Sequence, residues 1–289
     1  MLLVVSPLIG VLSMTPQFMI PFCVEISPKE TRGKNLGFVM AGLLLGILLA
    51  RTYSGFVGDI FGWRFAYLLA SSVILALSIL QYFLLPTSQP NFHGNYFKLI
   101  TSIFTLVKSY KKLRQAMMIG ALHFGAFSAF WATLIFLMES PQFHYGPKAV
   151  GLFGIIGAAG ALTAPLIGRL ADKRDPIVTV RLGAVLMVAS YAVYYFLGGY
   201  SILALIIGVI LMDIGLQATH VSNQNRVFGL DANSRNRLNT AYMFSYFIGG
   251  ASGSFLGTVA WQYYQWAGVS LLGIAMTILA FLLSYKKVD

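Results

Sequence analysis

Four polar residues recur along one face of a segment that is otherwise apolar. They are spaced four, three and four residues apart, which places them on one side of a helix: Asp213, Gln217, His220 and Gln224. Lipid cannot face such a stripe, because ionisable side chains are costly in hydrocarbon and usually line a water-filled pathway. The pattern predicts a pathway for substrate or protons along this face. The alternative is that the four side chains only hydrogen-bond to neighbouring helices.

Two further ionisable residues lie within apolar segments, His123 and Arg51. His123 and Asp213 each lie nine residues from the predicted cytoplasmic end of their span, which is about 14 Å along a helix. Equal depth, together with the titration of histidine near neutral pH, predicts that they form a proton-responsive pair. Arg51 lies about five residues from the outer end of its span, so we expect it to extend outward toward Asp59 or hydrated groups. Binding of a substrate anion is the alternative for Arg51.

The composition indicates a membrane protein. Of the 289 residues, 57% are hydrophobic and 10% are charged, and the mean hydropathy is +0.75. Soluble domains carry roughly 25% charged residues. The net charge of +11 would suggest nucleic acid only if Lys and Arg gathered on one face or tail, but they occupy short loops between apolar runs. The single cysteine, Cys23, excludes an internal disulfide and a multi-cysteine metal site. We therefore expect no nucleic acid, cofactor or metal.

Apolar runs of the length that crosses a bilayer, about 20 residues, recur along the chain. About nine are present, near residues 2–24, 33–56, 64–85, 114–138, 148–168, 178–198, 200–222, 238–260 and 266–284. A polar stretch from Pro86 to Lys112 separates three of them from six. The sequence thus predicts an all-α membrane protein with an incomplete N-terminal half at residues 1–85, a cytoplasmic linker 86–113 with some surface helix, and a six-helix half 114–289.

Alternate loops differ in their basic residues. One set carries 17 Lys and Arg residues, whereas the other carries only Arg64 and Lys148. Positively charged loops are retained in the cytoplasm, so the C-terminus is predicted to be cytoplasmic and, with nine spans, the N-terminus outside. We expect a multi-pass, monomeric protein of the plasma membrane, which is the inner membrane in bacteria.

The chain repeats itself at an offset of 203 residues. This offset pairs Arg32 with Arg235, Met40 with Met243, Gly46 with Gly249 and Trp63 with Trp266. Both matched turns are predicted to face the cytoplasm, so the two segments form a parallel repeat, as in several transporter folds. The second half begins near residue 114, and its counterpart would begin before residue 1. We therefore expect an N-terminal half that lacks about ninety residues, or three helices.

Two groups of short motifs carry a family resemblance. The first group is Pro28, Arg32-Gly33-Lys34, Gly37, Met40, the glycine- and leucine-rich run from Gly42 to Arg51, Ser54-Gly55 and Gly62-Trp63-Arg64. The second is the segment from Gly168 to Lys173, Asn223-Gln224-Asn225-Arg226 and the segment from Arg235 to Thr240. Together they resemble the major facilitator superfamily, specifically its drug/proton antiporter and sugar-efflux permease branch. The resemblance covers nearly the whole chain and implies the major facilitator fold, represented here by family helices four to twelve.

The resemblance also implies a cytoplasmic gate. Its members would be Arg32, Gly168, Asp172, Lys173 and Arg235. Asp172 is expected to accept hydrogen bonds at the N-terminus of the helix beginning near Arg32, where the helix dipole favours negative charge. The alternative for Asp172 is an ordinary solvated loop charge.

Glycines recur every four residues in two segments. They are Gly42 and Gly46 in the first segment and Gly249, Gly253 and Gly257 in the second. This spacing lets helix backbones approach closely, and we expect packing to be their main role, with movement between the two halves as an alternative.

One segment permits an enzyme hypothesis. Gly250-Ala251-Ser252-Gly253 has the form found in intramembrane serine proteases, but in that resemblance a later histidine acts as base and none follows His220. Close helix packing explains the segment better. No enzyme is therefore predicted.

The most consistent function is transport. We expect proton-coupled export of small organic compounds, drug-like or sugar-like, by alternating access between two helical halves. The expected partners are the lipid bilayer, a small organic substrate and protons. Two alternatives remain open: an importer of the same fold, and a truncated product that does not transport.

Overall fold

The computed structural model describes residues 5, 8–10, 12, 15, 19, 22–23, 26–28, 32–86, 96–161, 175–231 and 234–286. The chain has two compact units, Met1–Arg51 and Thr52–Asp289. The boundary between their residue ranges falls within α3 (Arg32–Phe61), whereas the sequence places the division between halves in the linker 86–113. The division into halves therefore stays a prediction.

All regular elements of the described residues are helical. After α3 come α4 (Trp63–Leu84), α5 (Tyr96–Ser109), α6 (Lys111–Met138), α7 (Pro147–Ala161), α9 (Pro176–Val193), the π-helix η1 (Tyr194–Gly198), α10 (Ile202–Phe228) and α11 (Arg235–Tyr285). Five helices in the described residues are long and apolar enough to cross a membrane: Trp63–Leu84, Lys111–Met138, Pro176–Gly198, Ile202–Phe228 and Arg235–Tyr285. The predicted all-α membrane fold is confirmed. The predicted span 2–24 lies mostly outside the described residues.

The longest helix contains a break. α11 has 51 residues, and Gln265 within it has φ 52° and ψ −147°, so two helices meet there. The break falls between the predicted spans 238–260 and 266–284. Trp266, directly after it, donates from Nε1 to the carbonyl of Tyr194 at 2.9 Å, at the start of η1. A π-helix leaves carbonyls without their usual i+4 partner, and the indole supplies one here.

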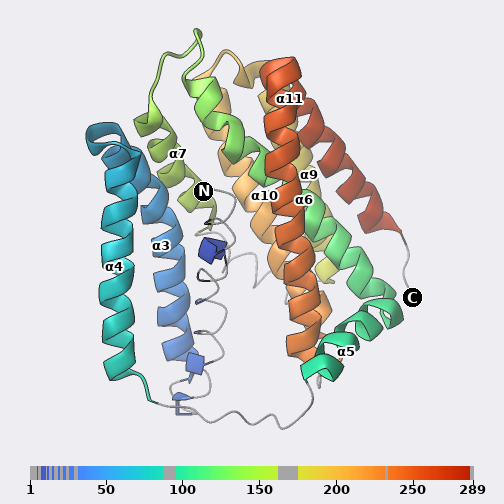
Figure 1. Cartoon of the computed structure of the whole chain (residues 1–289). Helices are drawn as coiled ribbons and strands as arrows, with labels where there is room; N and C mark the ends of the chain where they lie inside the picture. Colours follow the sequence, from blue (N-terminus) through green and yellow to red (C-terminus); the bar gives the residue numbers. More distant parts are fainter. Residues whose placement is uncertain are drawn as a thin grey trace. The chain divides into compact units, whose positions relative to one another are not determined.

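Helices α6 and α11 pack through small residues. A Cβ built on Gly253 would lie 2.5 Å from the Cα of Gly125, and one on Gly257 would lie 2.8 Å from the Cα of Ala129. A Cβ on Gly249 would meet the backbone of Ala121. The two backbones therefore touch along two turns, which a larger side chain on α11 would prevent. Figure 1 shows the two helices side by side, next to α9 and α10.

A second close seam joins α9 and α10. A Cβ on Gly183 would lie 2.6 Å from the carbonyl oxygen of Gly215, and one on Gly215 would lie 2.7 Å from that of Gly183. Nearby, the ring of Tyr194 packs against Gly208. Tyr194 is fully buried and stacks on Phe130 of α6, with ring centroids 4.6 Å apart. These contacts hold α6, α9 and α10 as one bundle.

Polar side chains tie four helix ends together. Gln115 of α6 donates from Nε2 to the carbonyls of Leu283 (2.7 Å) and Lys286 (2.8 Å) at the end of α11. Its Oε1 accepts from Arg226, near the end of α10. Arg181 of α9 donates to the carbonyl of Ser284 at 3.3 Å. The start of α6, the first turns of α9 and the ends of α10 and α11 therefore share one face of the bundle, and all of them carry basic residues.

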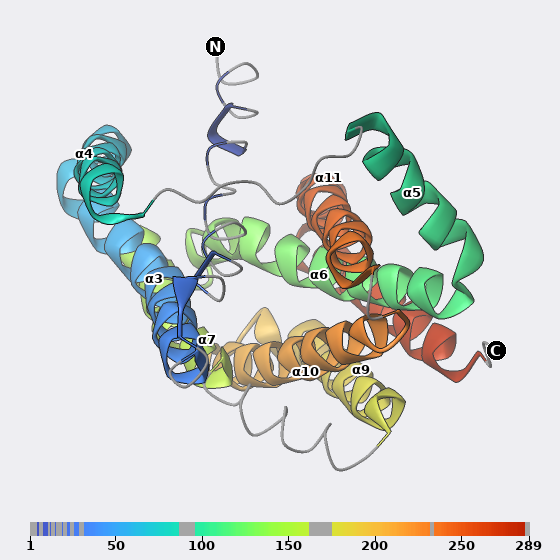
Figure 2. The same cartoon turned by 90° about the horizontal axis from the view of Figure 1, so that it is seen from below.

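Helix α5 lies within the predicted linker. Its apolar residues Ile103, Leu106 and Val107 pack against the cluster that contains Leu113 and Leu238. Figures 1 and 2 show α5 at the end of the bundle where α6 begins, crossing the direction of α11. This arrangement agrees with the surface helix expected in the linker.

Candidate functional site

The polar stripe of α10 faces the interior of the bundle. Asp213 is 7% exposed, and Gln217, His220 and Gln224 are half-buried. The apolar residues Leu203 and Ile207, which lie about 70° and 110° around the helix from the middle of the stripe, are 65% and 45% exposed. The structure therefore keeps the four polar side chains on one face of α10, beside its exposed apolar face.

His220 is held by aromatic residues of α11. Its Nδ1 lies 3.2 Å from the hydroxyl of Tyr242, within hydrogen-bond distance, and its ring centroid lies 4.7 Å from that of Tyr246. Tyr242 can approach because Gly120 of α6 leaves room, since a Cβ there would lie 2.9 Å from the tyrosine ring. One turn further along α10, the amide of Gln224 lies 3.9 Å from the sulfur of Met243.

A row of aromatic rings continues from this histidine along α6. Tyr246 stacks on Phe124, with centroids 4.1 Å apart and ring planes 14° apart. Phe127 follows at 5.8 Å from Phe124, and Trp131 at 6.1 Å from Phe127. Phe124, Phe127 and Trp131 are three and four residues apart and so share one face of α6. We call these residues, together with Tyr242 and Tyr246, the aromatic row.

The far end of the aromatic row reaches Asp213. A Cβ built on Gly157 of α7 would lie 3.0 Å from Oδ2 of Asp213 and 3.4 Å from Cζ2 of Trp131. The carboxylate therefore lies beside Gly157 and near the indole of Trp131. Any side chain at position 157 would displace either the carboxylate of Asp213 or the indole of Trp131. The stripe of α10 and the aromatic row thus run along each other from His220 to Asp213.

The structure does not bring His123 and Asp213 together. Trp131, which neighbours the carboxylate, is eight residues from His123, about 12 Å along α6. The depth estimate from the sequence counted from residue 222, but α10 continues to Phe228. No hydrogen bond joins the two residues, since neither ring nitrogen of His123 has a partner among the described residues, and a proton-responsive role for the pair stays a prediction.

His123 faces a different neighbour. Ile119 and Ala126, which share its face by helical spacing, contact α9: Ile119 packs with Val180, and Tyr191 donates its hydroxyl proton to the carbonyl of Ala126. His123 is fully buried, and neither ring nitrogen has a hydrogen-bond partner among the described residues. Its face of α6 carries Ile119, which belongs to one buried cluster with Val180 of α9 and Ala280 of α11.

Most of the predicted gate lies outside the described residues. Gly168, Asp172 and Lys173 fall in the segment 162–174, and the side chains of Arg32 and Arg51 are also outside the described set. Arg235 is described and exposed, and its Nε donates to the carbonyl of Phe228 at 3.3 Å, at the end of α10. The gate stays a prediction.

The predicted packing glycines divide into two groups. Gly249, Gly253 and Gly257 lie against α6, as described above. Gly42 and Gly46 are exposed, and no described atom lies within 4 Å of a Cβ built on either. Within the described residues, no group of three or more His, Cys, Asp and Glu side chains is placed to hold a metal ion.

Comparison with known proteins identifies the family. The chain matches the model of the Major Facilitator Superfamily over residues 1–254. It is 38% identical to an uncharacterized transporter of Escherichia coli O157:H7, over 99% of this chain and 72% of the relative. A probable transporter of Streptomyces coelicolor is 31% identical, over 92% of this chain and 62% of the relative. A probable sugar efflux transporter of Helicobacter acinonychis is 22% identical, over 89% of this chain and 64% of the relative.

These matches agree with the apolar helices and with the inward polar stripe of α10, and they confirm the family expected from the sequence motifs. The chain is a multi-pass integral membrane protein and belongs to the major facilitator superfamily of transporters.

Proposed function

We propose that the polar stripe of α10 and the aromatic row line the path of a small organic substrate, which the protein exports in exchange for protons. The observation that carries the proposal is their juxtaposition from His220 to Asp213. Aromatic faces accept the apolar body of an organic molecule, and the amides of Gln217 and Gln224 can hydrogen-bond to its polar groups. An apolar wall opposite a few polar groups is the usual composition of a small-molecule site.

Asp213 is the carboxylate best placed for proton coupling. The other described carboxylates lie at or near helix ends or in turns: Asp59, Glu139, Asp175 and Asp231. Asp213 lies eleven residues into α10 and fifteen before its end. A carboxylate at membrane depth can hold either a proton or a polar group of the substrate, and binding of one disfavours the other. That competition is the basis of exchange.

The direction and location of transport follow from two kinds of support. Two Helicobacter relatives, 22% and 21% identical, are named probable sugar efflux transporters, which favours export. The basic loops favour a cytoplasmic C-terminus, and the bacterial sources of the relatives favour the bacterial inner membrane. Alternating access would then expose the stripe first to the cytoplasm and then to the outside.

Proton release from everted membrane vesicles tests the proposal. Vesicles that contain the protein are acidified by respiration and monitored with a pH-sensitive dye, and ethidium and lactose are added as a drug-like and a sugar-like probe. We expect at least one probe to dissipate the pH gradient, and Asp213→Asn to abolish this response. Glu139→Gln, a matched change at the exposed end of α6, should leave it intact. A response that survives Asp213→Asn, or the absence of any response, would argue against proton-coupled export.

A further inference from the structure

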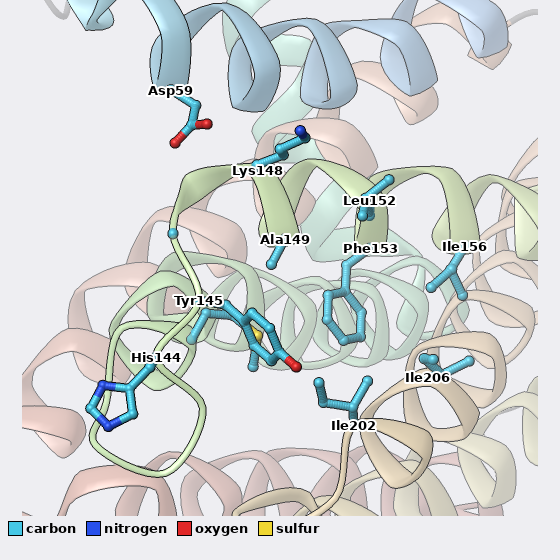
Figure 3. Close-up of a pocket in the computed structure, with 12 residues that line it drawn as sticks. Asp59, His144, Tyr145, Lys148, Ala149, Leu152, Phe153, Ile156, Ile202 and Ile206 are labelled. Carbon is cyan, nitrogen blue, oxygen red and sulfur yellow. The ribbon is translucent and has the colours of Figure 1, made fainter.

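A pocket lies at the end of the bundle away from Gln115. Its volume is about 490 Å³, and it is bounded by the end of α3, the α6–α7 turn, the start of α7 and the start of α10. This volume is within the range of sites that bind drug-sized molecules, roughly 300–1,000 Å³. The inner end of the pocket, at Ile156, lies next to Gly157 and so beside Trp131 and the Asp213 end of the stripe. Figure 3 shows Tyr145, Phe153 and Ile202 converging on it, with Asp59 and Lys148 at one side.

The deep part of the pocket is apolar and elongated. Ala149, Phe153 and Ile156 line it from α7, and Ile202 and Ile206 line it from α10. Each set follows helical spacing, so the two sets form facing walls that run along the helices. Phe153 is 4% exposed, which makes it part of the bundle's core as well as of the wall.

The pocket has the depth of one bilayer leaflet. Ile156 lies nine residues after Pro147, the first residue of α7, which corresponds to about 13 Å along the helix. The hydrocarbon core of a bilayer is about 30 Å thick, so one leaflet contributes about 15 Å. Leu152, at the edge of the pocket, is 47% exposed, and the groove is therefore open toward lipid.

The mouth of the pocket carries both signs of charge. Asp59, near the end of α3, and Lys148, in the first turn of α7, are both exposed lining residues. Oδ1 of Asp59 lies 3.6 Å from a Cβ built on Gly146, and Nζ of Lys148 lies 5.0 Å from the centre of the Phe56 ring. Neither charge forms a salt bridge with another described residue. Both charges line the mouth, where the ammonium and the phosphate of a head group can contact them.

We propose that this pocket binds a phosphatidylethanolamine molecule from the bilayer, with one acyl chain between α7 and α10 and the head group at the mouth. The ammonium would pair with Asp59 and the phosphate with Lys148. The acyl chain fits the apolar walls, the depth of one leaflet and the opening toward lipid. The two opposite charges account for the preference for a zwitterionic head group. The proposal does not depend on the exported substrate.

Trp131 provides a reporter at the inner end of the groove. Ile156 lies in the wall, and the next residue, Gly157, has its Cβ position 3.4 Å from the indole. The chain has four tryptophans. Trp63→Phe and Trp261→Phe remove two of the others, and Trp266 belongs to the same core cluster as Phe153 of the wall. Quenching that disappears in Trp131→Phe is therefore quenching of Trp131.

Fluorescence in nanodiscs tests the proposal. Brominated phosphatidylethanolamine should quench Trp131 at low mole fraction and saturably, and brominated phosphatidylglycerol should do so weakly. Ala149→Phe fills the groove and should remove most of the quenching. Ala76→Phe, the same change at an exposed position on α4, should not. Asp59→Asn combined with Lys148→Gln should remove the preference between the two lipids without filling the groove.

Three outcomes would overturn the assignment. Equal quenching by both lipids in the unaltered protein would show general lipid contact rather than a site. Unchanged quenching in Ala149→Phe would show that the lipid does not bind in the groove. If that variant fails to fold, Ala149→Leu fills the groove with a smaller side chain and serves the same test. The third outcome is that ethidium displaces the lipid in the unaltered protein and fails to do so in Ala149→Phe and Ala149→Leu. That result would assign the pocket to a transported amphiphile.

Discussion

Replacing Gly253 by alanine should loosen the seam between α6 and α11. A Cβ at this position would lie 2.5 Å from the Cα of Gly125, whereas ordinary van der Waals contact begins at 3.4 Å. Because the obstructing atoms belong to the backbone, no side chain can rotate away. One helix must move by about 1 Å, which separates the turns at Gly249 and Gly257 as well. Overpacking of this kind typically costs about 1–3 kcal/mol.

Thermal unfolding of the purified protein in nanodiscs measures this cost. With roughly 2–4 °C per kcal/mol for a domain of about this size, Gly253→Ala should lower the transition by roughly 2–12 °C. Gly58→Ala in α3 is the matched control, because no described atom lies within 4 Å of a Cβ built there. Alanine is also the better helix former, so the control should be neutral or stabilising. If the two variants melt alike, close backbone packing is not what stabilises this seam.

Two further predictions concern topology and the tied helix ends. In a Cys23→Ser background, cysteines introduced at Lys29 or Lys173 should react only from the cytoplasm and one at Lys148 only from outside; labelling of position 148 from the cytoplasm alone would contradict the charge rule. Gln115→Leu removes the hydrogen bonds of Gln115 to the carbonyls of Leu283 and Lys286 and to Arg226, at a cost of about 1–3 kcal/mol. Arg226 keeps its bond to Asn223, and the Leu283 carbonyl keeps its bond from the backbone N–H of Lys286. Amide hydrogen exchange in the last turn of α11 should therefore speed up. The exposed control Gln142→Leu should leave it unchanged, and equal exchange in both variants would refute the role of Gln115.

The helices of the described residues follow from local properties of the sequence. Uninterrupted apolar runs specify them, since only a helix satisfies its own backbone in lipid. The break at Gln265 lies between two predicted spans, where the apolar run is interrupted by Gln262 and Gln265. The inward face of α10 was equally predictable, because four polar residues at helical spacing cannot face lipid.

The partners of that face were harder to predict. The aromatic row contains Phe124, Phe127 and Trp131 at helical spacing, a signal that the sequence does hold. Which helix they would meet depends on packing between segments far apart in the chain. Gly120 and Gly157 help to decide these partners, because Gly120 leaves space for the ring of Tyr242 and Gly157 leaves space for the carboxylate of Asp213.

The pairing of His123 with Asp213 shows the limit of counting depth alone. Distance from a helix end gives one coordinate, but the direction of a side chain around the helix gives another. His123 shares the face of Ile119, which packs on α9, whereas Trp131 on another face neighbours Asp213. The direction of a side chain around α6, as well as its depth along the helix, therefore decides which residues it meets.

Cysteine accessibility on α10 tests most directly whether the polar stripe lines an aqueous path. In a Cys23→Ser background, Gln217→Cys lies on the stripe, and Ile207→Cys lies on the 45% exposed apolar side of the same helix. A charged, membrane-impermeant thiol reagent reacts with the thiolate, which forms in water and not in hydrocarbon. We predict modification of Gln217→Cys and none of Ile207→Cys in nanodiscs. An unreactive Gln217→Cys beside a reactive Ile207→Cys would contradict a substrate pathway along the stripe.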